Sequence, residues 1–120
     1  MEPAKNFRDL IVWMKAHLFV LGVYRDTEKF PRNELFGLSA QFRRAAVSIA
    51  ANIAEGFKKS GLRDKVRIFN IAEGSVEECR YYLILSQDLG YKVDEKQMAL
   101  LEEVSKLLLA YSAAIRRQIS

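Results

Sequence analysis

The sequence predicts an all-α protein built as one antiparallel four-helix bundle. Its 120 residues are enough for one domain and too few for two. Half of the residues are hydrophobic and 28% are charged, which is typical of a globular chain. Apolar residues recur at the spacing of amphipathic helices along most of the chain, and strong strand patterns are absent. We therefore expect a single helical domain over residues 1–120.

The first predicted helix spans about residues 7–25 and ends before Phe30-Pro31, because proline disfavours a helical conformation in the residue that precedes it. The stripe expected to face the core consists of Phe7, Leu10, Ile11, Met14, Leu18 and Leu21. A second apolar face, more than about 90° around the helix, consists of Val12, Phe19 and Val23. A helix that is apolar on two sides needs burial on both, so this pattern favours self-association.

The next two helices are indicated by composition and by the signals at their ends. Residues 31–37 form a predicted loop with room for one helical turn, and an alanine-rich helix follows over about 38–58. Ser60-Gly61 breaks that helix, and Ser60 is expected to cap the third helix, which is predicted over about 62–89. Gly90 suits the left-handed position that ends such a helix.

The fourth helix is predicted over about 95–119, and Asp94 with Gln97 reads as a capping box at its start. One amphipathic stripe is expected to reach the core, and it consists of Leu101, Val104, Leu108, Tyr111 and Ile115. Short connections between consecutive helices favour an antiparallel up-down-up-down course.

Cysteine and histidine usage excludes several kinds of site. The chain has one cysteine, Cys79, and one histidine, His17, so a disulfide or a Cys/His zinc site within one chain is excluded. A di-iron bundle needs two Glu-x-x-His pairs and is excluded as well. No metal or other cofactor is expected. The chain start lacks the apolar core of a signal peptide, and no run is long enough to span a membrane, so we expect a cytoplasmic protein without membrane contact.

A line of polar residues at helical spacing follows the alanine-rich helix. It consists of Gln41, Arg44, Ser48, Asn52 and Glu55. Ser75 and Glu78 are expected to meet it from the third helix, where Gly74 would allow close approach. We interpret these residues as a structural hydrogen-bond network or as a contact between subunits.

The alternative interpretation of the polar line is a catalytic site. Glu55, Glu78 and Arg44 could perform acid–base chemistry, or Cys79 could act as a nucleophile with His17 as its base. No metal or cofactor pattern accompanies the carboxylates, and Cys79 is expected to pack in the core. An enzyme is therefore not expected, and no catalytic residue is assigned.

Basic residues are concentrated at one end of the predicted bundle, although the whole chain has a net charge of only +4. That end collects the chain start, the junction of helices two and three, and the C-terminus. Its nine basic residues are Lys5, Arg8, Lys58, Lys59, Arg63, Lys65, Arg67, Arg116 and Arg117. Its four acidic residues are Glu2, Asp9, Glu55 and Asp64. The seven from Lys58 to Arg117 are candidate contacts to phosphate groups; the alternative is that they are solvated helix ends.

Several strings of residues resemble one protein family. They are Phe30-Pro31 with Glu34 and Phe36-Gly37-Leu38, then Gln41 with Arg43-Arg44-Ala45-Ala46-Val47-Ser48-Ile49, then Asn52-Ile53-Ala54-Glu55-Gly56. Further matching residues are Ala72, Gly74-Ser75, Glu78 and Leu89-Gly90-Tyr91. With these residues the chain resembles the four-helix-bundle proteins encoded in intervening sequences of bacterial large-subunit (23S) ribosomal RNA genes. These proteins are also called S23 ribosomal protein-like.

The resemblance implies a small cytoplasmic bundle that assembles as a ring-like homopentamer. It extends to the accessory variability protein of diversity-generating retroelements, which is thought to bind nucleic acid and a reverse transcriptase. Cyclic symmetry would point all five subunits the same way and place roughly +25 of charge on one rim.

We therefore expect a non-enzymatic oligomer that binds the backbone of RNA or DNA through a basic rim. Such binding would depend on shape and charge, because no base-reading motif is present. The alternative is a scaffold or adaptor that binds another protein without contacting nucleic acid, through exposed aromatic residues such as Tyr81.

Overall fold

The computed structural model describes residues 3–119, and all of its regular structure is helical. The four α-helices are α1 (Ile11–Glu28), α2 (Leu38–Lys58), α3 (Leu62–Asp88) and α4 (Lys96–Arg116). Two single 3₁₀ turns, Phe7–Asp9 and Arg32–Glu34, precede α1 and α2. Across residues 3–119 no strand is formed, which agrees with the all-α prediction.

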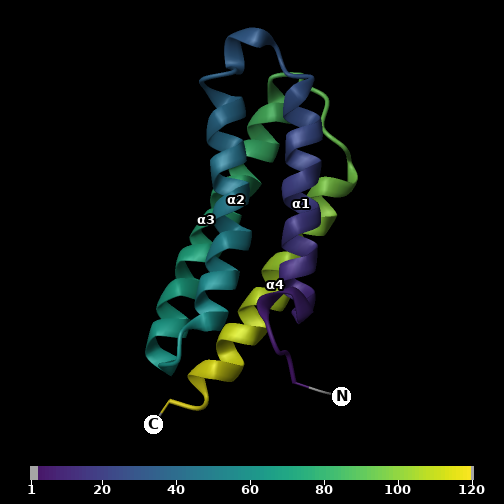
Figure 1. Cartoon of the computed structure of the whole chain (residues 1–120). Helices are drawn as coiled ribbons and strands as arrows, with labels where there is room; N and C mark the ends of the chain where they lie inside the picture. The colour runs from purple at the N-terminus through teal and green to yellow at the C-terminus, as the bar shows by residue number, and fades with distance from the viewer. Residues whose placement is uncertain (1–2, 120) are drawn as a thin grey trace.

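The four helices lie lengthwise around a common core in a body of 49 × 25 × 18 Å (Figure 1). Each helix packs against two others, so that α1 and α3 lie diagonally and both contact α2 and α4. The α1–α2 loop and the end of α3 lie at one end of the body, which we call the loop end. The α2–α3 turn and the end of α4 lie at the other, which we call the basic end.

Aromatic and aliphatic side chains from all four helices fill the core. Phe19, Phe42 and Phe69 are fully buried, and the rings of Phe19 and Phe42 lie 6.4 Å apart across the α1–α2 contact. The predicted stripe of α4 reaches this core, with four of its five members buried and Tyr111 half-buried against Phe69. Each large apolar side chain buried in this way contributes about 1.5–3 kcal/mol to folding.

The face of α1 that packs on the core differs from the prediction. The buried residues of its middle are Val12, Ala16, Phe19, Val20, Gly22 and Val23. Ile11, Met14, Leu18 and Leu21, predicted to face the core, are instead 41–59% exposed. We call these four side chains the α1 seam. The buried face of α1 is the one that contains Ala16 and Gly22, because these small residues let α1 approach its neighbours closely.

Gln97 explains the glycine on the buried face of α1. The predicted capping box is wrong, because the Gln97 side chain turns inward, where its Nε2 donates to the Phe19 carbonyl at 3.3 Å. A Cβ atom at position 22 would lie 2.5 Å from Gln97 Oε1, so only glycine leaves room for this contact. Asp94 does accept the Lys96 N–H at 2.9 Å, as expected near a helix start.

The helix ends agree with the prediction to within a few residues. The bounds predicted for α2 are confirmed, α1 continues three residues past the predicted end at Arg25, and α4 ends at Arg116. Ser60 does not cap α3, because the residue before that helix is Gly61 and no side chain caps it. Gly90 follows α3 with φ +80°, which confirms its left-handed role.

The loop end is fastened by three carboxylate contacts. The Tyr91 hydroxyl donates to Glu34 Oε2 at 2.7 Å, and the Leu38 N–H donates to Glu34 Oε1 at 3.3 Å. The Asp94 N–H donates to Asp26 Oδ2 at 3.2 Å, tying α1 to the segment before α4. The pKa of the Asp26 carboxyl is raised above its usual range, and burial is the largest cause. The connections at this end are therefore held in place by side chains as well as by the helices.

Candidate nucleic-acid interface

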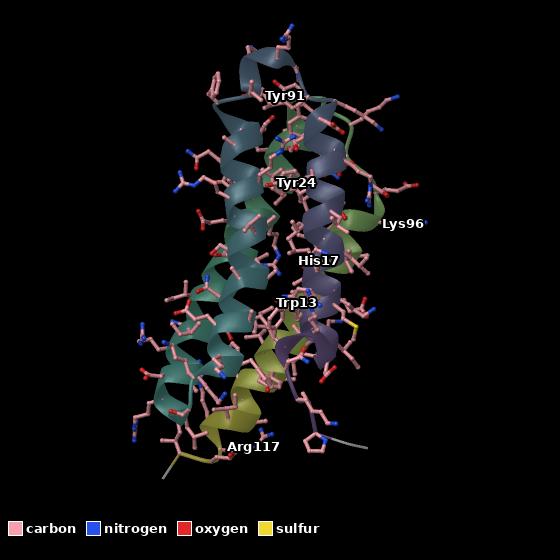
Figure 2. The ribbon with its side chains drawn as sticks, viewed as in Figure 1. Trp13, His17, Tyr24, Tyr91, Lys96 and Arg117 are labelled. Carbon is pink, nitrogen blue, oxygen red and sulfur yellow. The ribbon has the colours of Figure 1, made fainter. Side chains whose placement is uncertain are left out.

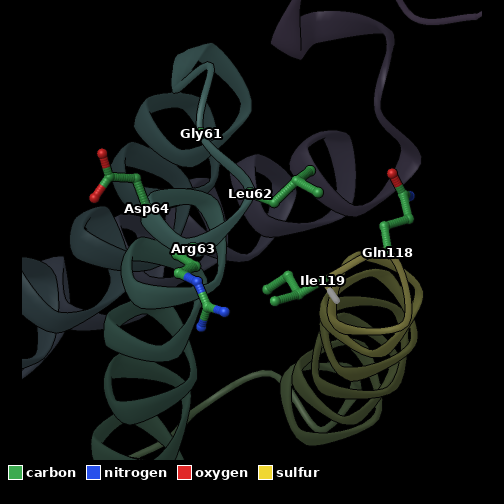
Figure 3. A pocket seen from close by; sticks show the side chains of 6 residues that line it. All are labelled: Gly61, Leu62, Arg63, Asp64, Gln118 and Ile119. Carbon is green, nitrogen blue, oxygen red and sulfur yellow. The ribbon is translucent and has the colours of Figure 1, made fainter.

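The basic end brings the α2–α3 turn beside the last residues of the chain. Between them lies an open hollow of about 480 Å³, lined by Gly61, Leu62, Arg63, Asp64, Gln118 and Ile119. Figure 3 shows Leu62 and Ile119 pointing toward one another, with Arg63 beside them on α3. Arg117 lies at the same end, as Figure 2 shows. The sequence-predicted cations of residues 58–67 and 116–117 therefore belong to one end of the molecule.

Four of the seven candidate phosphate contacts have no acidic partner. Lys58, Arg63, Arg116 and Arg117 are exposed and form no salt bridge with any residue that the structure describes. We call these four side chains the open cations. Their positive charge is available to an anion from solution, because no carboxylate in the described chain neutralises it at close range.

Two further candidates form loose surface ion pairs. Lys59 Nζ lies 3.9 Å from Glu55 Oε1, and Arg67 Nε lies 3.7 Å from Asp64 Oδ1. Exposed pairs at such distances contribute about 0–1 kcal/mol, so an incoming phosphate could replace either carboxylate at small cost.

Lys65 differs from the other six because the protein itself uses its ammonium group. Nζ donates to the carbonyl of Phe57 at 2.6 Å and to that of Gly56 at 3.2 Å, so Lys65 caps the C-terminal end of α2. The ammonium also lies 5.4 Å from the centre of the Phe57 ring. Burial lowers the pKa of the Lys65 ammonium below its usual range. Lys65 therefore holds the α2–α3 turn in shape.

The N-terminal segment lies apart from this hollow. Lys5 and Asp9 line a second, more apolar hollow of about 760 Å³ together with Leu107 and Tyr111 of α4. The Asp9 carboxylate accepts the backbone N–H of Lys5 at 2.9 Å and so is occupied in capping the turn before α1. Lys5 and Asp9 therefore line a different hollow from the one beside the α2–α3 turn.

The polar line predicted on α2 lies on the outside of the α2–α3 pair. Ser75 Oγ donates to Ser48 Oγ at 2.8 Å, and Asn52 Nδ2 donates to the Ser48 carbonyl at 2.8 Å and to its hydroxyl at 2.9 Å. Ser48 also lines a small polar hollow of about 260 Å³ with Gln41, Arg44, Ala45 and Glu78. Glu55 is not part of this group, because its carboxylate faces Lys59. Six of the seven predicted residues are thus brought together.

The residues of the catalytic alternative assemble only in part, because Arg44 and Glu78 share the polar hollow whereas Glu55 faces Lys59. Cys79 is fully buried, and burial, with a smaller effect from Glu78, raises the pKa of its thiol, which leaves no reactive thiolate. His17 is exposed on α1 and stacks on Trp13 with ring centres 5.0 Å apart (Figure 2). Over residues 3–119 no group of three His, Cys, Asp or Glu side chains has the arrangement of a metal site. None of the helices within that range is long and apolar enough to cross a membrane.

Two apolar surfaces were missed by sequence reasoning. One is the α1 seam, which was placed in the core. The other is a shallow groove between α1 and α2, lined by Phe7, Trp13, His17, Val20, Val47, Ala50, Ala51 and Ala54. The spacing of its alanines on the α1 side of α2 is the signal that could have identified it.

Comparison with known proteins identifies relatives of this chain. A family model described as 23S rRNA-intervening sequence protein matches residues 8–111. The crystal structure of a protein of unknown function from the S23 ribosomal protein family of Bacteroides thetaiotaomicron is similar, with a TM-score of 0.76 and 25% sequence identity. The match covers 86% of this chain and 96% of that one. No protein of curated function matches.

Proposed function

The chain belongs to the 23S rRNA-intervening sequence protein family, as its sequence motifs suggested. We propose that it is a non-enzymatic oligomer that binds RNA or DNA in the cytoplasm. Binding occurs through the phosphate backbone at the basic end. The observation that carries this proposal is the group of four open cations on one end of the bundle.

The local electrostatics favour an anion at this end. The open cations come from three places, the end of α2, the start of α3 and the end of α4. The first amides of α3 have no capping side chain, so the positive end of that helix dipole adds to the field of the side chains. The sequence contains no base-reading motif, so recognition depends on charge and shape.

Assembly of several copies would strengthen the positive electrostatic field of the basic end. We propose an antiparallel up-down-up-down course for the helices and a ring-like homopentamer of the whole chain. The positions of the turns at opposite ends of the body support the first part, and the unpartnered α1 seam supports self-association. Cyclic symmetry points every basic end the same way, so five copies would align about twenty open cations on one rim.

The test compares two variants that remove the same charge from opposite ends. In the first, Lys58, Arg63, Arg116 and Arg117 are replaced by glutamine. In the matched control, the exposed Lys29, Arg32, Lys92 and Lys96 of the loop end are replaced by glutamine. Fluorescence anisotropy with labelled RNA and DNA oligonucleotides measures the Kd of each protein.

We expect the Kd of the first variant to rise about 100-fold and that of the control to change less than about threefold, because only the first removes phosphate contacts. Equal losses in the two variants would indicate a response to net charge alone and would contradict the assigned surface. Wild-type protein that retains neither oligonucleotide at low salt would contradict nucleic-acid binding altogether.

A second candidate function is a protein adaptor, and it is favoured by the loop between α1 and α2. Phe36 is 91% exposed at its tip, with Leu35 half-exposed beside it. Glu34, held by Tyr91 and Leu38, fixes the backbone next to this phenylalanine. An aromatic side chain presented on a fixed loop loses little entropy on binding, which is typical of anchor residues in protein interfaces.

A photo-crosslinking residue at position 36 tests the adaptor function in native cells. A single crosslinked protein that survives nuclease treatment, and whose co-purification is lost with Phe36→Ser, would favour the adaptor. Crosslinks that disappear with nuclease treatment would favour the nucleic-acid function.

A further inference from the structure

The α1 seam is an apolar stripe without a partner in its own chain. Its members follow one another at intervals of three, four and three residues, the spacing of helices that pack side by side. All four are 41–59% exposed, so about half of each side chain remains in water. A stripe of this length is larger than the scattered apolar residues of a typical monomer surface.

A second apolar stripe lies on the diagonal helix, α3. Ile71, Tyr81 and Ile84 are exposed there, Tyr81 by 57%. Gly74 lies between them, and nothing is found within 4 Å of the position that its Cβ would occupy. The missing side chain leaves a shallow place beside Ile71 and Tyr81 where a large aliphatic group could fit. We call Ile71, Gly74, Tyr81 and Ile84 the α3 seam.

The charged residues near the two seams differ, because those near the α3 seam are mostly acidic. Between residues 10 and 25 α1 contains two cations and no acidic residue: Arg25, and Lys15, which pairs with Glu103 of its own chain at 3.0 Å. Asp26 and Glu28 follow at the end of the helix. Between residues 70 and 88 α3 contains Glu73, Glu77, Glu78 and Asp88 against the single Arg80. Glu78 is exposed beside the α3 seam, one turn before Tyr81. Like charge therefore opposes the contact of α3 with itself more than its contact with α1.

We propose that the α1 seam of one copy packs against the α3 seam of the next copy. This inference depends on the self-association proposed above and names the two surfaces that form it. Because α1 and α3 are diagonal in the bundle, a copy can use both seams at once, one for each neighbour. Such a contact is heterologous, and it closes into a ring when the rotation between neighbours divides a full turn.

Two single substitutions and a matched control test the seams separately. Leu18→Asp places a charge in the α1 seam, and Tyr81→Asp places one in the α3 seam. Leu109→Asp is the control, because Leu109 is 49% exposed on α4 and belongs to neither seam. Light scattering gives the mass of each protein, and circular dichroism verifies that its helix content equals that of the wild type.

We expect the wild type and Leu109→Asp to share one multimeric mass. Leu18→Asp and Tyr81→Asp should each have the mass of one chain, 13.8 kDa. An oligomeric wild type whose mass neither substitution lowers would overturn the seam assignment while leaving self-association intact. A wild type of 13.8 kDa at every concentration would contradict self-association itself, and the seam assignment with it.

Mixing the two defective variants tests whether the contact is heterologous. Leu18→Asp retains an intact α3 seam and Tyr81→Asp retains an intact α1 seam, so together they should form a dimer of about 28 kDa that cannot grow further. Sedimentation equilibrium over a concentration series measures this product. Pairing of α1 with α1 predicts instead that Tyr81→Asp keeps the wild-type mass and that the mixture forms no mixed dimer, and either result would overturn the proposal.

Discussion

Lys65 and Arg63 lie two positions apart at the start of α3, and their charged groups have different surroundings. The Lys65 ammonium is hydrogen-bonded to the carbonyls of Gly56 and Phe57, whereas the Arg63 guanidinium lines the open hollow and forms no salt bridge with a described residue. A basic residue near a helix end can therefore either complete the fold or remain available to a ligand.

We expect Lys65→Met to lower the free energy of unfolding by about 1–2 kcal/mol, because two carbonyls at the end of α2 lose their donor. The affinity of the folded protein for RNA should change little. Arg63→Met should do the reverse, with unchanged stability and weaker binding. Urea unfolding and fluorescence anisotropy measure the two quantities on the same samples; a Lys65→Met protein of wild-type stability would contradict the capping role.

The sequence could not distinguish these two residues. Both are basic residues in the same short segment, and the bonds of Lys65 depend on where the end of α2 comes to lie against α3. Gly90, by contrast, was predictable, because a left-handed residue after a helix requires only local information.

At the scale of elements, the bounds of α2 followed from its composition and from the Ser60-Gly61 break, and the structure confirms them. The face of α1 that packs on the core could not be predicted from the sequence in the same way. Its sequence has two apolar faces, and hydrophobic periodicity favours the one with the larger side chains. The core selects the face with Ala16 and Gly22, because helix packing depends on the distance that small residues permit as well as on hydrophobicity.

The contact of α2 with α3 depends on a second small residue. A Cβ at Gly56 would lie 2.6 Å from Cε1 of the buried Phe69 ring. Gly74, which was expected to permit this approach, has open space around it instead. The close contact therefore occurs near the basic end, and the position of Gly56 fixes how the α2–α3 turn is presented.

Gly56→Ala should consequently destabilise the bundle by about 1–3 kcal/mol, because the Phe69 ring would have to move within a packed core. Gly74→Ala should stabilise it by about 0.5–1 kcal/mol, since alanine is a better helix former and meets no neighbour. Urea unfolding in the Leu18→Asp background separates these effects from assembly. Equal effects of the two substitutions would contradict the difference in packing.

At the scale of the whole molecule, the net charge of +4 hides an uneven distribution. The four open cations all lie at the basic end, whereas the loop end contains buried or engaged carboxylates such as Asp26 and Glu34. The candidate site was partly predictable for this reason, because helix order alone places residues 58–67 and 116–117 at one end. The sequence does not show which of these cations lack a partner, because their carboxylate and carbonyl partners come into reach only in the folded chain.

The salt dependence of binding should report how many phosphates the basic end contacts. A plot of log K against log salt concentration should be linear, with a slope of about −0.7 to −0.9 for each phosphate neutralised. We expect the glutamine variant of the open cations to have a shallower slope and the loop-end control to keep the wild-type slope. A wild-type affinity independent of salt would contradict binding through the backbone.

The contact between Gly22 and Gln97 restricts which residues can replace either one during evolution. Any side chain at position 22 would collide with the Gln97 amide, and loss of that amide would leave a void beside Gly22 and remove its hydrogen bond to the Phe19 carbonyl. Neither position can change alone without a cost in stability. Across lineages that keep this bundle the two positions should therefore covary, with glycine accompanying glutamine and a larger residue at 22 accompanying a shorter one at 97.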